Sequence, residues 1–265
     1  MYREKNRPIW QKYILSVVGI VTLLLLWEVL VRINILSVDK VVAPSQIVLT
    51  FIEKLSNPVP DGGTIVVHLA VSLRLVLLGF LVSVVIGVIL GLLMGFFESC
   101  DRFFTPIFEI IRPIPPLAWI PIVIVVLGIG MKAELFIIFV AAFVPCVINS
   151  YLGIKGTSKI LINVAKTAGA SKWQIFTKVG IPSALPMVFT GIKVSFGSAW
   201  ATLVAAEMVA SSKGLGFMSQ QGRQASRPDI VLLGMAVIGL VGAVLTGILT
   251  IIEKKAIPWR HMDVK

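Results

Sequence analysis

The chain has 265 residues, of which 57% are hydrophobic and only 14% are charged, and its formal net charge is +11. A soluble domain carries about 25% charged residues, so this composition excludes an ordinary soluble protein and indicates an integral membrane protein. The basic residues lie between apolar runs, where they act as topology signals, so we expect no nucleic-acid partner. The two cysteines, Cys100 and Cys146, have no metal-ligand spacing and predict no disulfide framework.

The first predicted span covers residues 13–31, which is long enough to cross a hydrocarbon core of about 30 Å. A basic segment, residues 1–12, precedes it. Because the apolar run contains no small-residue cleavage site, we expect an uncleaved span and no signal peptide. Near its end, Glu28 and Arg32 have the i, i+4 spacing of an interfacial ion pair, and a role in a substrate path is the alternative.

Residues 33–64 form a predicted loop rich in proline and glycine, in which residues 45–55 are expected to form a short amphipathic helix at the membrane interface. The second span covers residues 69–96. Small residues recur every four positions along it and form a stripe on which another helix is expected to pack closely. The stripe consists of Gly79, Ser83, Gly87, Gly91 and Gly95.

Residues 97–116 are predicted to be a loop ending in three closely spaced prolines, which forbid a regular helix there. Non-helical backbone near membrane depth is tolerated where protein or a water-filled cavity surrounds it. The prolines therefore form either a rigid turn or the border of a translocation path. The candidate path residues in this part are Arg112, Pro113, Pro115 and Trp119. A short third span, residues 117–129, and a fourth span, residues 134–153, follow, and Pro145 is expected to kink the fourth.

A polar segment rich in lysine lies between the fourth and fifth spans and begins with a predicted helix over residues 160–168. Gly169 suits the C-terminus of that helix, and Ser171 suits the N-cap of a second short helix over residues 172–179. Pro182 suits the first turn of the next apolar run. We therefore predict a helix–turn–helix that can insert into a cleft on another protein.

The fifth span, residues 183–206, carries polar or small side chains on two opposite faces. An intramembrane lysine is costly and is by default a functional hypothesis. Lys193 is therefore expected either to pair with a carboxylate or to provide positive potential along a substrate path. Glu207, at the outer end, suits a gate or an interface pair. The candidate path residues of this region are Lys193, Ser195, Ser198, Thr202 and Glu207.

Residues 207–229 are predicted to be an outer loop, in which residues 211–222 are either an ordinary flexible segment or a functional surface. The sixth span covers residues 230–252, followed by a basic tail over residues 253–265. With six spans and the N-terminus inside, the inner segments carry 15 of the 24 lysines and arginines, and the outer segments carry 7. Because basic residues favour the cytoplasmic side, both termini and the helix–turn–helix are expected in the cytoplasm.

The sequence contains no catalytic constellation. His68 and His261 flank no cluster of cysteines or carboxylates, and no glycine-rich phosphate loop followed by Lys-Ser/Thr is present. We therefore expect no enzyme activity and no cofactor bound by this chain, so any energy from ATP must come from a partner.

The helix–turn–helix resembles the cytoplasmic EAA loop of bacterial ABC importer permeases. Ala165, Gly169 and Pro182 fall on the family pattern, whereas Asn163 and Val164 replace its Glu and first Ala. Further motifs look like the nitrate, sulfonate, taurine and bicarbonate branch of these permeases. They are RPIPPLAWIP (residues 112–121), AEM (206–208) and GLG (214–216).

The resemblance implies an all-α fold of the type I ABC importer permeases, with one transmembrane domain over residues 13–252 and a coupling loop over residues 155–180. It also implies a bacterial inner-membrane location among lipid, a second permease copy forming a homodimer, two cytoplasmic ATPase subunits that use ATP and Mg²⁺, and an extracytoplasmic binding protein. That protein would contact residues 211–222, or these residues would cap the path. The implied coupling residues are Ala165, Ala168, Gly169, Ala170, Ser171, Trp173, Phe176 and Pro182.

The implied substrate is a small oxyanion or sulfonate. A pyrimidine precursor or another organic solute is the alternative within the same branch, because most selectivity lies in the separate binding protein. A secondary transporter or channel that works alone is a further alternative. It would need intramembrane proton or ion relays and two related inverted halves, and the sequence shows few such residues and no such halves.

Overall fold

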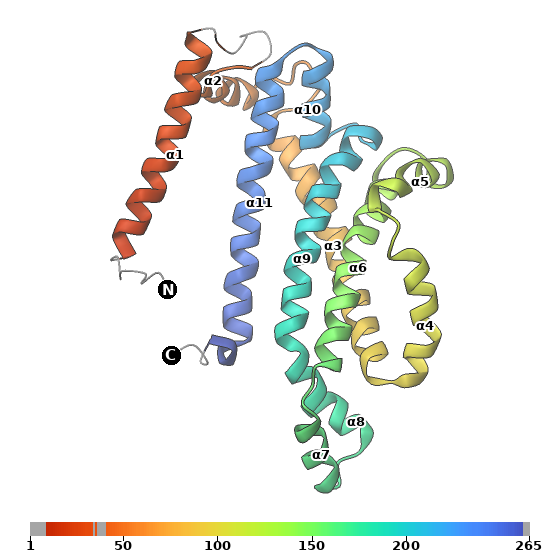
Figure 1. Ribbon diagram of the computed structural model, residues 1–265. Helices are drawn as coiled ribbons and strands as arrows, with labels where there is room; N and C mark the ends of the chain where they lie inside the picture. The colour runs from red at the N-terminus through yellow and green to blue at the C-terminus, as the bar shows by residue number, and fades with distance from the viewer. Residues whose placement is uncertain (1–8, 34, 36–40, 262–265) are drawn as a thin grey trace.

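The computed structural model describes residues 9–33, 35 and 41–261, and the regular elements among these residues are all helices (Figure 1). The predicted all-α class is therefore confirmed. Parts of both predicted terminal segments, residues 1–8 and 262–265, lie outside the described residues. Five helices are long and apolar enough to cross a membrane: α1 (Ile9–Arg32), α3 (Ile65–Phe96), α6 (Met131–Lys155), α9 (Ile181–Ala210) and α11 (Pro228–Ala256).

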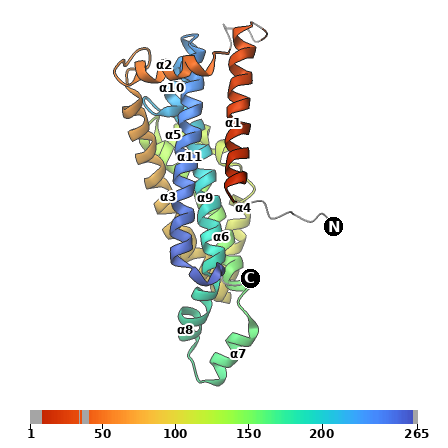
Figure 2. The same ribbon diagram turned by 90° about the vertical axis from the view of Figure 1, so that its left-hand side faces the viewer.

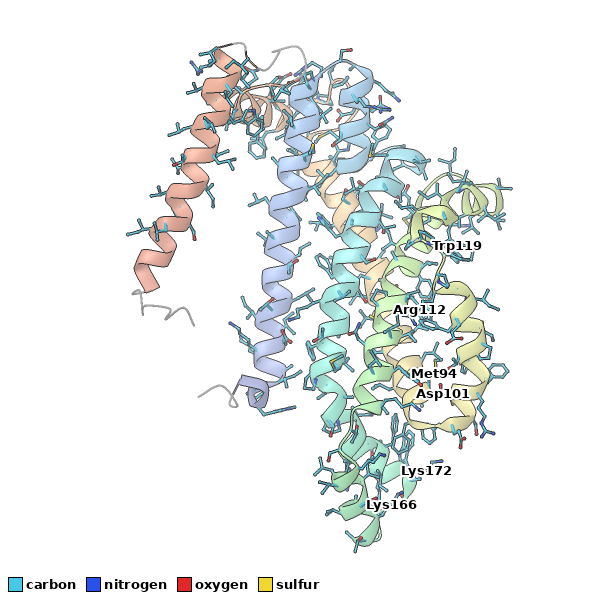
Figure 3. All side chains as sticks on the ribbon, viewed as in Figure 1. Met94, Asp101, Arg112, Trp119, Lys166 and Lys172 are labelled. Carbon is cyan, nitrogen blue, oxygen red and sulfur yellow. The ribbon has the colours of Figure 1, made fainter. Side chains whose placement is uncertain are left out.

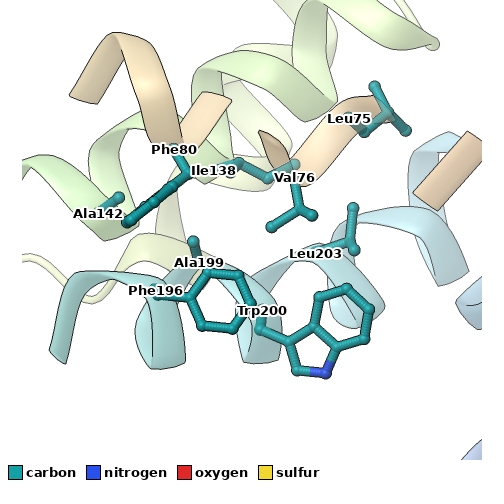
Figure 4. Packing of buried hydrophobic residues seen from close by; sticks show 9 residues of the cluster. All are labelled: Leu75, Val76, Phe80, Ile138, Ala142, Phe196, Ala199, Trp200 and Leu203. Carbon is teal, nitrogen blue, oxygen red and sulfur yellow. The ribbon is translucent and has the colours of Figure 1, made fainter. Parts of the chain in front are cut away.

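Helices α3, α6 and α9 pack together and form the centre of the bundle, and α11 lies against α9 (Figures 1 and 2). Figure 4 shows the apolar core between them, to which Phe80, Ile138 and Phe196 each contribute from a different helix. The rings of Phe80 and Phe196 meet edge to face with centroids 5.5 Å apart. The indole of Trp200 donates to Ile238 O at 3.1 Å and ties α11 to this core.

Helix α1 stands apart from the other long helices, and its apolar side chains are largely exposed (Figure 2). It is joined at its end to α2 (Pro44–Lys54), the amphipathic helix predicted over residues 45–55. Arg32 Nε donates to Glu28 Oε1 at 2.7 Å, and the Ser45 hydroxyl of α2 donates to the same oxygen at 2.8 Å. The predicted Glu28–Arg32 pair therefore also holds the start of α2.

The two ends of the bundle differ. Helices α7 (Lys159–Thr167) and α8 (Lys172–Ile175) project from one end, beyond the end of α11, and α2 and α10 (Leu215–Gln224) lie at the other (Figure 1). The outer loop predicted over residues 207–229 contains α10, so the prediction of a flexible segment over residues 211–222 is wrong. The glycines of this segment do not loosen it: Gly214, with φ of +125°, is the N-cap of α10, and Leu215 and Met218 are buried.

The small-residue stripe of α3 faces α6. Ser83 Oγ donates to Phe139 O of α6 at 2.9 Å, and a Cβ added to Gly91 would lie 2.5 Å from Val147 O. Every stripe residue is buried. The absence of larger side chains brings the two backbones together, which provides van der Waals contact where lipid offers no hydrophobic drive.

The predicted loop over residues 97–116 is mostly a helix, α4 (Glu98–Ile111). The prolines that forbid a helix begin only at Pro113, whereas Glu98 and Asp101 favour a helix start through the helix dipole. A short 3₁₀ turn, η1 (Pro116–Trp119), and α5 (Ile120–Leu127) follow at an angle of 80°.

Helix α5 alone spans about 12 Å, too little to cross a membrane. The predicted third span, residues 117–129, is therefore not a separate span: α4, η1 and α5 together form either one broken span or a re-entrant loop. Arg112 lies at the break, part-way along the bundle (Figure 3), and does not belong to the basic residues of the α7–α8 end.

Candidate coupling loop and polar membrane residues

The turn after α7 has the full hydrogen-bond pattern of a Schellman motif. Gly169 has a left-handed backbone, with φ of +77°. Its N–H donates to Lys166 O at 3.0 Å, and the Ala170 N–H donates to Ala165 O, also at 3.0 Å. These bonds satisfy carbonyls that the end of a helix leaves free. The predicted glycine turn is therefore observed, and glycine is favoured there because most other residues are strained at positive φ.

Helix α8 begins with a capping box. The Gln174 N–H donates to Ser171 Oγ at 3.2 Å, and the Ser171 N–H donates to Gln174 Oε1 at 2.8 Å. Ser171 is thus the N-cap that the sequence predicts, and Gln174 completes the reciprocal pair. Both ends of the tight corner between α7 and α8 are fixed by local hydrogen bonds, so the corner is rigid.

The second short helix, predicted over residues 172–179, is not separate from the fifth span, contrary to the prediction. Helix α8 continues through a π-helical turn, η2 (Phe176–Gly180), directly into α9. The Ile181 N–H bonds to Phe176 O, five residues back. Pro182 has no N–H to donate and its ring crowds the preceding turn, and the wider π turn accommodates this defect without breaking the helix.

Aromatic side chains attach the loop to the end of α3. Phe176 is buried, and its ring centroid lies 4.9 Å from that of Phe96 and 5.3 Å from that of Phe97. Trp173 also contacts Phe176, at 5.4 Å, but 60% of its surface is exposed. Of the two predicted aromatic coupling residues, Phe176 is therefore an internal anchor and Trp173 is available to a partner.

Helix α7 presents an apolar surface away from the bundle. Ile160 and Val164 are 74% and 62% exposed and lie one turn apart, and Leu161 is also exposed. Among the predicted loop residues, Ala168, Gly169, Ser171 and Pro182 are exposed, and Ala165 and Ala170 are half-buried. The three larger apolar residues were not among the predicted coupling residues, although their i, i+1, i+4 spacing on a short polar segment indicates an apolar face.

The break between α4 and α5 exposes Arg112, Pro113 and Pro115. Arg112 lines a pocket of about 250 Å³ between α4 and α6, together with Glu109 and Tyr151. Trp119, on the far side of the break, is half-buried, and its indole N–H is buried without a hydrogen-bond partner in the part of the chain that the structure describes.

Lys193 pairs with a carboxylate of another helix. Its Nζ donates to Glu253 Oε2 at 2.5 Å, and the side chain of Glu253 is only 5% exposed, against 29% for Lys193. Glu253 lies in the last turn of α11, so Lys193 is level with the end of that helix.

Three other predicted polar residues of α9 lie inside the protein. Ser195 is fully buried and its hydroxyl donates to Cys146 Sγ of α6 at 3.0 Å. Glu207 is also fully buried, accepting from Ser72 Oγ of α3 at 2.6 Å and from the Gly216 N–H of α10 at 2.8 Å. Thr202 is buried and Ser198 is half-buried. Ser195 and Glu207 therefore connect helices and are closed to solutes in this conformation.

The sequence profile of the family described as binding-protein-dependent transport system inner membrane component matches residues 83–258. The chain belongs to this family. The permease is 33% identical over 262 residues to the taurine transport system permease protein TauC of Escherichia coli, covering 97% of this chain and 94% of that protein. It is 32% identical over 257 residues to the putative aliphatic sulfonates transport permease protein SsuC of Bacillus subtilis, covering 97% and 90%.

The permease is also 31% identical over 264 residues to the nitrate import permease protein NrtB of a Synechocystis species, covering 97% of this chain and 95% of that protein. Among solved structures, the MetNI methionine ABC transporter in an inward-facing conformation contains a chain with a TM-score of 0.54 and 22% identity, which covers 67% of this permease and 92% of that chain. The expected fold, that of ABC importer permeases, and the expected branch are therefore confirmed.

At the end opposite the loop, the permease contains a buried ionic cluster that the sequence analysis missed. Lys54 Nζ donates to Asp61 Oδ1 at 2.5 Å and to Gly63 O at 2.9 Å, and the side chains of Lys54, Asp61 and His68 are all fully buried. The Gly214 N–H donates to His68 Nδ1 at 2.9 Å, and His68 Nε2 lies 3.2 Å from Asp61 Oδ2.

Burial by itself raises the pKa of Asp61, but the contacts from His68 and Lys54 outweigh it and hold that pKa below its usual value. The cluster joins α2, the connection to α3 and the loop before α10. Lys54, Asp61 and His68 follow one another at intervals of seven residues, but they belong to different elements, and Gly214 lies 146 residues from His68. The sequence pattern alone therefore does not show that these residues meet.

Proposed function

We propose that this permease forms the translocation path of an ATP-driven importer for a small oxyanion or sulfonate. In this proposal it works as a homodimer in the bacterial inner membrane, receives substrate from an extracytoplasmic binding protein and is driven by two cytoplasmic ATPases, which use ATP and Mg²⁺. The names of the relatives, which concern taurine, aliphatic sulfonates and nitrate, support this substrate class. The observation that carries the proposal is the rigid helix–turn–helix, with its exposed apolar face.

The geometry of the loop supports a mechanical role. The chain from Lys172 to Ala210 is one uninterrupted run of helix, so a displacement of α8 moves α9 directly. Phe176 links the same point to α3. Closure of the ATPases would pull on α7 and Trp173, rotate α9 against α6, and alternate the access of the path between the two sides of the membrane. Both termini and the loop would then lie in the cytoplasm.

One face of α9 is exposed, which supports the proposal that it contacts a second copy of the permease or lines the translocation path. Val194, Gly197 and Ala201 are exposed along one face of this central helix, and a Cβ added to Gly197 would meet no atom within 4 Å. Small residues permit close approach of a helix from another copy. Of the predicted path residues, we keep as candidates those whose side chains are exposed or half-buried in the protomer. They are Arg112, Pro113, Pro115, Trp119, Lys193 and Ser198.

The test is purification of the tagged chain from its native membranes, followed by identification of co-purifying proteins. We expect an ATPase with a phosphate-binding loop, and we expect Val164→Asp to release it because a charge enters the exposed apolar face of α7. Lys213→Asp, exposed at the opposite end, should retain it. Substrate uptake by proteoliposomes that contain this chain alone would overturn the proposal in favour of a secondary transporter.

A further inference from the structure

A basic pocket lies between the helix–turn–helix and the bundle. Its volume is about 550 Å³, and α7, α8 and the adjoining ends of α3 and α6 line it. None of its lining residues carries a carboxylate. Four of them are lysines: Lys155, Lys159, Lys166 and Lys172. Figure 3 shows two of them, Lys166 on α7 and Lys172 on α8. The pocket therefore has a positive potential that its own lining does not neutralise.

Two of the four lysines have other contacts. Lys155 Nζ lies 3.1 Å from Asp101 Oδ2, and Lys172 Nζ lies 5.5 Å from the ring centroid of Phe97. Lys159 and Lys166 have no ion-pair partner within the described residues. They are seven residues apart on α7, two helical turns, and so lie on the same face of that helix.

A second and independent feature of this pocket is a buried hydroxyl without a partner. Thr157 lines the pocket and is only 7% exposed, and its Oγ1 makes no hydrogen bond to any described residue. A buried polar group without a partner destabilises a fold, so natural structures rarely leave one unless a ligand, ion or water completes it.

The start of α7 adds further donors at the same place. Thr157 immediately precedes Ser158, the N-cap of α7, and Ser158 makes no capping hydrogen bond through its side chain. The first turn of this nine-residue helix contains no acidic residue. Its first backbone N–H groups therefore remain available, and the helix dipole favours an anion there.

From these observations we infer that the pocket binds a phosphate-class oxyanion, carried either by a free ion or by the headgroup of an anionic phospholipid. The Thr157 hydroxyl and the N–H groups at the start of α7 donate to its oxygens, and Lys159 and Lys166 supply positive charge. The bound anion bridges α7 to the ends of the membrane helices and stiffens the loop. This site does not depend on the proposed transport function, since every residue in it belongs to this chain.

The experiment uses the full-length chain in nanodiscs of zwitterionic phosphatidylcholine, with inorganic phosphate as the first probe and chloride at equal ionic strength as the reference. Phosphate should raise the thermal unfolding midpoint in a saturable manner. Lys159→Gln, Lys166→Gln and Thr157→Val should each weaken this response, by about tenfold in apparent affinity for each lysine. Lys178→Gln is the matched control, because Lys178 is exposed on the same loop but does not line the pocket.

The second arm replaces part of the phosphatidylcholine with phosphatidylglycerol. If the lipid headgroup occupies the site, phosphatidylglycerol raises the midpoint of the wild type and phosphate adds little; if the free ion occupies it, only phosphate acts. Either result supports the inference when Lys178→Gln behaves as the wild type and the pocket variants do not. Thr157→Val keeps the shape and charge of the site, so its response is informative even if a lysine variant folds poorly. Equal responses of Lys178→Gln and the pocket variants, or no response of the wild type to either probe, would overturn it.

Discussion

Lys193 Nζ lies 2.5 Å from Glu253 Oε2, and this ion pair joins α9 to the last turn of α11. The two residues are 60 positions apart, and the carboxylate is almost fully covered by protein. A covered charge is stable only with a partner. The pair therefore has a structural function whether or not Lys193 also faces the substrate.

The first prediction concerns this pair. Lys193→Met should lower the stability of the detergent-solubilised protein by about 2 kcal/mol, because it leaves a buried carboxylate without its cation. Lys193→Arg should retain most of the stability, since it keeps the charge. The thermal unfolding midpoint, followed by tryptophan fluorescence, measures both effects.

The double variant Lys193→Met/Glu253→Leu distinguishes the effect of the ion pair on stability from any effect of Lys193 on transport. It should recover much of the lost stability, because no charge remains uncompensated. Transport should still be reduced in this stable double variant if Lys193 also acts on an anionic substrate. A double variant less stable than either single one would contradict the structural role.

The α3–α6 contact predicts opposite effects for the same substitution at two helical glycines. Gly91→Ala should destabilise the protein by about 1–3 kcal/mol, because the added Cβ would lie 2.5 Å from Val147 O. Gly239→Ala on α11 should be neutral or stabilising by up to about 1 kcal/mol, because no atom lies within 4 Å of its Cβ and alanine favours the helix. Thermal unfolding of both variants tests this, and equal effects would refute the close contact.

The corner of the coupling loop predicts a variant that assembles but does not transport. Gly169→Asp places a charged side chain at a left-handed position where the surroundings are open. We expect normal membrane levels, since nothing in the protomer blocks the side chain, and uptake reduced to background, since in the proposed function the corner contacts an ATPase. Gly169→Asn, which tolerates the same backbone, is the control and should retain more uptake. Normal uptake by Gly169→Asp would exclude this corner from the ATPase contact.

The buried cluster at the other end predicts a pH dependence of stability. The pKa of Asp61 is lower in the folded than in the unfolded protein, so its contribution is complete above the usual value of 3.8 and is lost as the pH falls through the folded-state pKa. Unfolding by urea should therefore become easier below about pH 4. Asp61→Asn should be less stable at neutral pH and should lose less on acidification. If the stability of the wild type and that of Asp61→Asn fell in parallel with decreasing pH, Asp61 would contribute nothing to the pH dependence.

The coupling loop was predictable from sequence because its structure is local. Gly169 and Ser171 determine the corner through hydrogen bonds that span only a few residues. The small-residue stripe was equally visible, because every fourth residue of a helix returns to nearly the same face. Such features follow from spacing along the chain, and neither requires knowledge of which helices meet.

Other features depend on contacts between distant segments and could not be obtained in this way. The prolines after Arg112 led to the prediction of a loop over all of residues 97–116. They break the helix only at its end, and residues 98–111 form α4. The partner of Lys193 comes from the last turn of α11, and nothing in the sequence shows that this turn lies beside Lys193. For Glu207 the sequence left a gate and an interface pair open, because nothing in it shows that Ser72 and Gly216 meet this residue.

The π turn from Phe176 to Gly180 sets the rotational phase of α8 relative to α9. A π turn contains one more residue than an α turn needs, and each residue of a regular helix advances the side chains by about 100°. The direction in which Trp173 and the corner face is therefore fixed by the presence of a single residue in this turn. Deletion of one residue from this turn would therefore present the corner on a different side of the same helix axis.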